Sequence, residues 1–201
     1  NLLKTKDYNI FSVLQIQSKE VLICRMIADL LNPRGQHGAG AEYLKIFLRD
    51  CLGMEKMDTK LADQAIVTAE YAIDDERRID IVIEMGSYFL PIEVKIYAAD
   101  QKSQCFDYYQ YAKRRDAQAK VYYLTLDGHR PGKDSTSSGS QSVPEEDIVC
   151  LSFREHILNW LKACKNCGNT GMIPILEQFI RNIEQISGYT SERVRNMVID
   201  E

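Results

Sequence analysis

The stretch RRIDIVIEMGSYFLPIEVKIY, residues 77–97, contains two apolar runs that are typical of buried strands. Three ionisable side chains, Asp80, Glu93 and Lys95, interrupt these runs. Burying a charge without a partner costs free energy. The arrangement of these three charges therefore decides how the stretch is interpreted.

Gly86-Ser87 stands between the two runs and is typical of a two-residue hairpin turn of the Gly-X kind. Counting outward from this turn, we expect Asp80 to face Glu93, and alternation places Lys95 on the same face. The full prediction gives one face to Asp80, Val82, Glu84, Pro91, Glu93 and Lys95, and an apolar face to Ile79, Ile81, Ile83, Met85, Leu90, Ile92, Val94 and Ile96.

Two opposed carboxylates repel each other unless a cation lies between them. Mg²⁺ suits such a pair, because it takes one or two carboxylates and completes its shell with water and phosphate oxygen. Lys95 could then position or deprotonate an attacking water, or stabilise charge that builds on a phosphate. The alternative is a solvated strand face with an ordinary Glu93–Lys95 ion pair.

The rest of the chain predicts an α/β fold of the α+β kind, with a mixed sheet flanked by helices. We expect helices within 18–33, 41–53, 100–116, 154–164 and 173–187, and strands at 65–73, 119–127 and 147–153 in addition to the hairpin. Ser18 and Asp100 are the expected helix caps, and Gly53 the expected stop. The polar run at 128–147 predicts either a mobile functional loop or disorder.

Composition is that of a globular domain: 201 residues, 45% hydrophobic, net charge −4. We expect a single domain over 1–201, with a core at 18–127, a polar loop at 128–147 and a helical part at 148–201. The negative charge excludes a generally basic nucleic-acid-binding surface but permits a local basic patch. No apolar run approaches the ~20 residues that span a bilayer, and no signal peptide opens the chain, so we expect a cytoplasmic protein without membrane contact. The first residue is Asn1, which suggests an excerpt of a longer chain and leaves a partner domain or a homodimer open.

The six cysteines are scattered, and the apolar patterns around most of them predict buried, reduced thiols. Cys164 and Cys167 form a lone CxxC without a second pair or a nearby histidine at ligand spacing. A zinc-binding structural protein organised by these two residues is one alternative function.

The residues of the hairpin resemble the PD-(D/E)xK nuclease superfamily. The match consists of Ile79-Asp80, then Glu93-Val94-Lys95 closing the next strand, then a helix and another strand. The resemblance implies a restriction-endonuclease-like core of helix, three strands, helix and strand, here followed by extra C-terminal helices. Ile79 stands where the motif name has proline, a position that is loosely kept in the family.

Two further elements resemble that superfamily. Gln104 and Tyr108 lie four residues apart, hence on one helical face, and resemble the Q-x-x-x-Y element that lies beside the active site in exonuclease-like branches. Glu20, at the start of the first helix, is where the resemblance places an acidic residue that completes the metal site. The alternatives are a surface glutamine with a half-buried tyrosine, and a glutamate that only favours the helix dipole.

LLNPRGQHGAG, residues 30–40, resembles a stretch of a poorly characterised bacterial subgroup of the superfamily. Within it His37 is expected to cap the loop, with phosphate contact as the alternative. Basic residues, namely Arg77, Arg78, Lys113, Arg114 and Arg115, are candidates for contact with a DNA backbone.

The resemblance implies a Mg²⁺-dependent nuclease, with Mn²⁺ as a substitute cation, that hydrolyses phosphodiester bonds of nucleic acid and favours DNA. Asp80, Glu93, Glu20 and the Val94 carbonyl are the implied metal ligands, Lys95 assists the attacking water, and Gln104 and Tyr108 support. A non-catalytic nucleic-acid-binding or interaction module on the same fold is the alternative.

Overall fold

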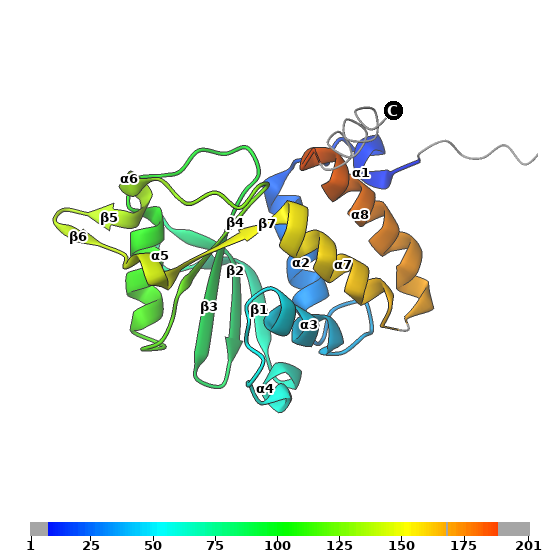
Figure 1. The fold of residues 1–201 in the computed structure, drawn as a ribbon, viewed down its shortest axis with the longest axis horizontal. Helices are drawn as coiled ribbons and strands as arrows, with labels where there is room; N and C mark the ends of the chain where they lie inside the picture. The colour runs from blue at the N-terminus through cyan, green and yellow to red at the C-terminus, as the bar shows by residue number, and fades with distance from the viewer. Residues whose placement is uncertain (1–7, 168, 189–201) are drawn as a thin grey trace, which may run out of the picture.

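The computed structural model describes residues 8–167 and 169–188. A five-stranded sheet in the order β1-β2-β3-β4-β7 runs through the molecule, with helices on both faces (Figure 1). Its strands are β1 (Ile66–Ala72), β2 (Arg78–Met85), β3 (Tyr88–Lys95), β4 (Val121–Thr125) and β7 (Ile148–Ser152). The β1-β2 and β2-β3 pairs are antiparallel, whereas β3-β4 and β4-β7 are parallel. The predicted mixed sheet is thereby confirmed.

The hairpin between β2 and β3 has the predicted register. Met85 pairs with Tyr88 beside the turn, and Ile81 pairs with Ile92 further along. Gly86 has φ 57°, a left-handed value that glycine adopts without strain. The start of β2, which carries Asp80, therefore lies beside the end of β3.

The main hydrophobic core fills the space between one face of the sheet and four helices. These are α2 (Glu20–Leu31), α3 (Glu42–Asp50), α7 (Leu158–Lys165) and α8 (Ile173–Ile186). Two short helices escaped prediction, namely α1 (Ile10–Val13) and α4 (Thr59–Asp63). The α1 helix packs on α8, where the Phe11 and Phe179 rings stack with their centroids 5.3 Å apart.

The opposite face of the sheet is covered by α5 (Gln104–Lys113) (Figure 1). One prediction for this region was wrong: Ile79 packs on the α5 side with Val82 and Tyr108, whereas the other residues of the predicted apolar face pack in the main core. In the neighbouring strand Glu70 has φ 53°, which interrupts the regular alternation of side chains where β1 pairs with the start of β2.

The polar run at 128–147 is not a structureless loop, contrary to the prediction. It contains α6 (Lys133–Thr136), a small hairpin of β5 (Ser137–Ser138) and β6 (Gln141–Ser142), and a 3₁₀ turn (Glu145–Asp147). Ser135 is buried against α5, and its hydroxyl accepts a hydrogen bond from the Cys105 amide at 3.3 Å. Local hydrogen bonds to α5 order a segment that lacks apolar periodicity.

Both predicted caps were misplaced. The α2 helix begins after Lys19, one residue later than a Ser18 cap requires. The α5 helix begins after Ser103, whose φ is 57°, and Asp100 serves elsewhere. The C-terminal helices are confirmed, with a π-helical turn (Phe153–Ile157) leading into α7 and a 3₁₀ turn (Thr170–Met172) leading into α8.

In the part of the chain that the structure describes, no helix combines the length and apolar character that crossing a membrane requires.

Candidate active site

The three charges of the hairpin meet where β2 begins and β3 ends. Asp80 accepts a hydrogen bond from the backbone N–H of Val94, which joins Oδ2 to the amide nitrogen at 2.7 Å. Asp80 was predicted to face Glu93, and this bond ties the Asp80 carboxylate to Val94, the residue after Glu93, at the end of β3. Rigid strands therefore position both carboxylates.

Glu93 and Lys95 form a buried ion pair, with Nζ 2.5 Å from Oε1 and side-chain exposures of 8% for the lysine and 1% for the glutamate. The second carboxylate oxygen of Glu93, Oε2, is buried and accepts no hydrogen bond from the described residues. A buried oxygen without a donor is costly. The Glu93–Lys95 pair is thus buried rather than solvated, which argues against an ordinary surface ion pair.

The electrostatics of the site favour a bound positive charge. Burial, and secondly the Asp80 carboxylate, raise the pKa of Glu93 well above its ordinary value. Burial also raises the pKa of Asp80, although the Val94 hydrogen bond opposes the shift. Burial alone would lower the pKa of Lys95, but the nearby carboxylates, chiefly that of Glu93, together hold it above its ordinary value. A bound cation would favour the ionised form of both carboxylates, which burial disfavours.

Glu20 reaches the same place from the start of α2. Its Oε2 accepts a hydrogen bond from the Ile96 backbone N–H at 2.8 Å, directly beyond Lys95. The Glu20 charge also contributes to the raised pKa of Asp80. Glu20 thus lies both in the first turn of the helix and beside the hairpin charges; its role in completing a metal site stays a prediction.

Gln104 and Tyr108 are both buried on the face of α5 that covers the sheet. The Gln104 amide donates to the Tyr108 hydroxyl at 3.1 Å, and that hydroxyl donates to the Arg78 carbonyl at 2.5 Å. Burial and the Glu93 charge raise the pKa of Tyr108. This chain of bonds fixes α5 against the start of β2, two residues before Asp80, so the predicted surface alternative for the pair is wrong.

Replacing Tyr108 with phenylalanine is expected to lower the free energy of unfolding by about 1–3 kcal/mol, because the Arg78 carbonyl and the buried Gln104 amide lose their partner. Urea unfolding of the variant beside wild type measures the loss. Tyr8→Phe, which alters a tyrosine that is 56% exposed, is the control. Equal stability of Tyr108→Phe and wild type would contradict the assignment.

The cation-free protein is expected to lose stability as the pH rises above the ordinary glutamate value of 4.5, because the folded pKa of Glu93 is raised. Below that value both states hold the proton; above it the unfolded chain ionises first, so stability falls until the folded pKa is passed. Urea unfolding in EDTA, with Glu93→Gln as the reference, checks this. The two proteins should converge in acid, and a difference that does not vary with pH would contradict it.

The predicted basic residues are largely engaged in ion pairs on the protein itself. Arg77 pairs with Asp107, Lys113 with Asp147 and Arg115 with Glu84. Arg114 lies over the Tyr111 ring, and Arg78 is exposed. Because three of the five cations already have carboxylate partners, the structure gives little support to a continuous basic patch.

His37 has the structural role that was predicted. It is 3% exposed, its Nδ1 accepts from the Ala39 amide at 3.0 Å, and its Nε2 lies 2.9 Å from the Asn32 carbonyl. The ring stacks on Tyr43. Both ring nitrogens are used to close the loop after α2, so none is presented to a phosphate.

Cys164 is buried and Cys167 is exposed. Within residues 8–167 and 169–188, no three His, Cys, Asp or Glu side chains are arranged to hold a metal. The described part of the chain therefore gives the CxxC pair no third ligand, and a structural zinc site has no support. Burial raises the pKa of the Cys164 thiol, as expected for an inert core cysteine.

The hairpin carboxylates likewise do not form a group of three metal-ligating side chains in the described residues. For Mg²⁺ this does not argue against a site. A hard divalent cation such as Mg²⁺ needs only one or two carboxylates, because water and phosphate complete its shell. Asp80, Glu93 and Glu20 offer only oxygen atoms as metal ligands. Of these, Glu93 Oε2 is buried and has no hydrogen-bond partner among the described residues. These residues fit a divalent metal, and the Val94 carbonyl remains a predicted ligand.

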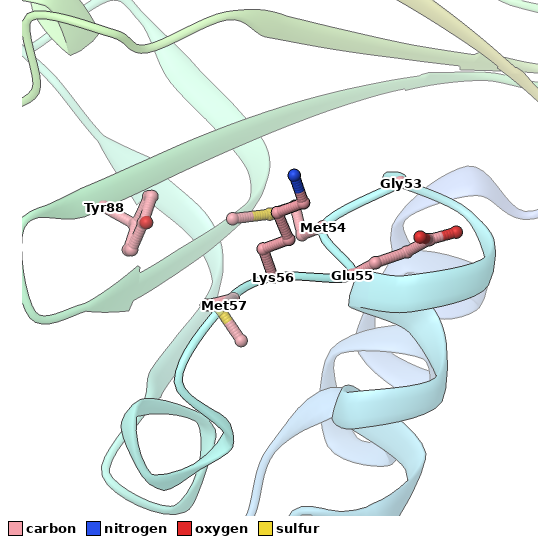
Figure 2. Close-up of a pocket in the computed structure, with 6 residues that line it drawn as sticks. All are labelled: Gly53, Met54, Glu55, Lys56, Met57 and Tyr88. Carbon is pink, nitrogen blue, oxygen red and sulfur yellow. The ribbon is translucent and has the colours of Figure 1, made fainter.

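A separate hollow of about 340 Å³ lies near Tyr88, at the opposite end of β3 from Lys95. Figure 2 shows the loop after α3, with Met54, Lys56 and Met57, beside this tyrosine. Its lining contains one carboxylate, Glu55, rather than a pair, so the hollow is distinct from the candidate active site. It supplies matched control positions, Glu55 and Lys56, both exposed.

Two polar residues beside the site were not predicted. Asp127 and His129 follow the end of β4, whose Tyr123 and Thr125 pair with Glu93 and Lys95. Thr125, Asp127 and His129 continue the every-second-residue alternation of β4 beyond its end, in T-L-D-G-H at 125–129. This pattern could indicate a site residue only once β4 is known to pair with β3.

A family model described as PD-(D/E)XK nuclease superfamily matches residues 8–182. No curated protein and no solved structure gives a significant match.

Proposed function

The chain belongs to the PD-(D/E)XK nuclease superfamily, and on that premise we propose that it is a Mg²⁺-dependent nuclease that hydrolyses phosphodiester bonds, with DNA as its substrate and the cytoplasm as its compartment. The observation that carries the proposal is the meeting of Asp80, Glu93 and Lys95 at the joined ends of β2 and β3, inside a matched family domain. Burying charged side chains so close together lowers the stability of the fold, and a purely structural role would not require it.

Asp80 and Glu93 would hold the cation, with Glu20 and the Val94 carbonyl completing the protein's share of the ligands. When bound, Mg²⁺ or Mn²⁺ supplies the Lewis acidity that phosphodiester hydrolysis requires. The ligand oxygens are held in place by the Val94 amide, the Ile96 amide and the Lys95 ammonium.

Lys95 is proposed to orient the attacking water or to stabilise the negative charge that builds on the phosphate. Its pKa is raised, so it acts as a cation and a hydrogen-bond donor. Separation of Nζ from Glu93 would free it for this contact. The strand holds Nζ 2.5 Å from Glu93 Oε1, so the ammonium cation is in place before substrate binds.

Gln104 and Tyr108 are proposed to act by positioning. Their hydrogen bonds end on the Arg78 carbonyl, and they therefore hold the segment that carries Asp80. Preorganisation of this kind limits the rearrangement that the reaction demands.

The test is cleavage by purified protein of labelled single- and double-stranded DNA and of RNA, with Mg²⁺, with Mn²⁺ and with EDTA. We expect products only with a divalent cation, and from DNA. Absence of cleavage on every substrate would overturn the proposal.

The alternative is a non-catalytic nucleic-acid-binding module on the same fold. Two observations favour it. Lys95 forms an ion pair with one oxygen of Glu93, and no three His, Cys, Asp or Glu side chains of the described residues are arranged to hold a metal. Calorimetric titration with Mn²⁺ separates the two functions. Binding that disappears in Asp80→Asn supports the nuclease, and no binding by wild type supports the module.

A further inference from the structure

The loop after β4 presents a histidine and an aspartate on the same side of the sheet as the candidate active site. Thr125, the last residue of β4, pairs with Lys95, and Tyr123 pairs with Glu93. Paired residues of adjacent strands point to the same face, and adjacent strands lie about 4.8 Å apart. Asp127 and His129 continue the chain directly from this edge.

The two side chains form an exposed dyad. His129 Nδ1 lies 2.6 Å from Asp127 Oδ1, with side-chain exposures of 59% for the histidine and 57% for the aspartate. The same oxygen accepts from the His129 backbone N–H at 3.2 Å and from the Thr125 hydroxyl at 3.3 Å. The Thr125 hydroxyl and the His129 backbone N–H thus hold the Asp127 carboxylate, and the carboxylate orients the imidazole ring through Nδ1.

The loop that carries the dyad is anchored at both ends. The Gly128 amide donates to the Thr125 hydroxyl at 2.8 Å, and the Gly132 amide donates to Asp100 Oδ2 at 2.7 Å. Gly128 has φ 85°, and a Cβ there would lie 3.3 Å from that of Ser152, so glycine suits this turn. Two anchors and a tight turn make the placement of His129 a property of the fold.

The imidazole lies close to the face that carries Glu93. Its ring centroid is 6.2 Å from that of Tyr123, the residue paired with Glu93. The Tyr123 hydroxyl donates to Asp100 Oδ1 at 2.6 Å, which ties β4 to the segment that follows Lys95. The dyad therefore stands beside the end of β3 rather than on a remote surface.

The chemistry of such a dyad suits an anion. With Nδ1 held by Asp127, the ring turns Nε2 away from the carboxylate, and in the doubly protonated ring Nε2–H can be donated to a second acceptor. The anion that the site must receive is the phosphodiester backbone, whose oxygens accept charge-assisted hydrogen bonds. The basic residues predicted for that purpose are largely paired elsewhere.

We propose that His129, oriented by Asp127, contacts a substrate phosphate next to the one that is cleaved and so positions the nucleic-acid strand over Asp80, Glu93 and Lys95. This inference rests on the proposed nuclease function and adds a substrate-binding residue to it. Asp127 is a positioning residue that acts through His129. A simple surface ion pair would have no effect on nucleic-acid affinity.

The test measures binding of a short fluorescein-labelled DNA oligonucleotide by anisotropy, with Ca²⁺ in place of Mg²⁺, over a range of salt concentrations. His129→Ala is expected to raise Kd about tenfold, the effect of one charge-assisted hydrogen bond. The slope of log Kd against log salt should fall by about one phosphate contact. In cleavage with Mg²⁺ the loss should lie in KM rather than in kcat.

Further variants separate positioning from folding. His129→Lys places a permanent cation at this position and should retain the salt slope. Asp127→Asn should weaken binding less than His129→Ala, and the double variant should equal His129→Ala. Lys56→Gln, at the far end of β3, is the control for a lost surface charge, and thermal unfolding checks that each variant folds.

The outcomes distinguish this inference from the proposed function. Wild type that cleaves DNA while His129→Ala keeps its affinity and salt slope would overturn the role of His129 alone. Wild type that neither binds nor cleaves any nucleic acid would overturn the nuclease function and this inference with it.

Discussion

Replacing Asp80 with asparagine is expected to abolish cation-dependent cleavage and, at the same time, to stabilise the cation-free protein. Loss of a charged ligand removes several kcal/mol of transition-state stabilisation, which lowers the rate by at least about a thousandfold. Asparagine can still accept the Val94 hydrogen bond through its amide oxygen. It also ends the repulsion between two carboxylates, which is worth roughly 1 kcal/mol and about 2–4 °C in Tm.

The opposite signs of the two effects make this test informative. Cleavage of DNA with Mg²⁺ and thermal unfolding in EDTA are measured on the same preparation. Glu55→Gln, an exposed carboxylate at the other end of β3, should change neither. Full activity in Asp80→Asn would contradict the metal-ligand role, and a fall in Tm would contradict the electrostatic account.

Replacing Lys95 with methionine is expected to harm both activity and stability. Loss of a positioned proton donor or cation costs about 10²–10⁴ in rate. Removing one partner of a buried ion pair leaves Glu93 uncompensated, at a cost of about 3–5 kcal/mol when it stays ionised. Because the pKa of Glu93 is raised, protonation should restore part of that stability as the pH is lowered.

The double variant Glu93→Gln/Lys95→Met supplies the matched control for stability. It replaces both charges with neutral side chains of similar size, so it should unfold near wild type in EDTA while remaining inactive. Urea unfolding and single-turnover cleavage are the measurements. Equal destabilisation of the single and double variants would show that packing, rather than the ion pair, causes the loss. Lys56→Met controls for removal of a lysine.

The strands and their register were predictable from the sequence because they depend on local rules. Alternation and a Gly-X turn are sufficient to pair β2 with β3, and the pairing of Ile81 with Ile92 confirms the count. The long amphipathic helices were predictable for the same reason. The misplaced caps at Ser18 and Asp100 show the limit of such rules, because Asp100 bonds to Tyr123 and Gly132, which lie far along the chain.

The composition of the candidate site was predictable, but its environment was not. Asp80, Glu93 and Lys95 follow from the hairpin register and Glu20 from the family resemblance, whereas the burial of Glu93 and Lys95 depends on tertiary packing. The dyad after β4 depends on a parallel pairing that joins residues about 30 positions apart, and no local pattern specifies which strand lies beside β3. The segment 128–147 was read as loop because its order comes from contacts with α5.

The contact between α1 and α8 has a consequence for synthesis of the chain. The Asn9 amide donates to the Gln178 carbonyl at 2.8 Å, and Phe11 stacks on Phe179, across a separation of almost the whole described chain. Helix α1 can pack on α8 only after α8 has been synthesised. The part of the main core that α8 completes therefore closes only after residues 173–186 have left the ribosome.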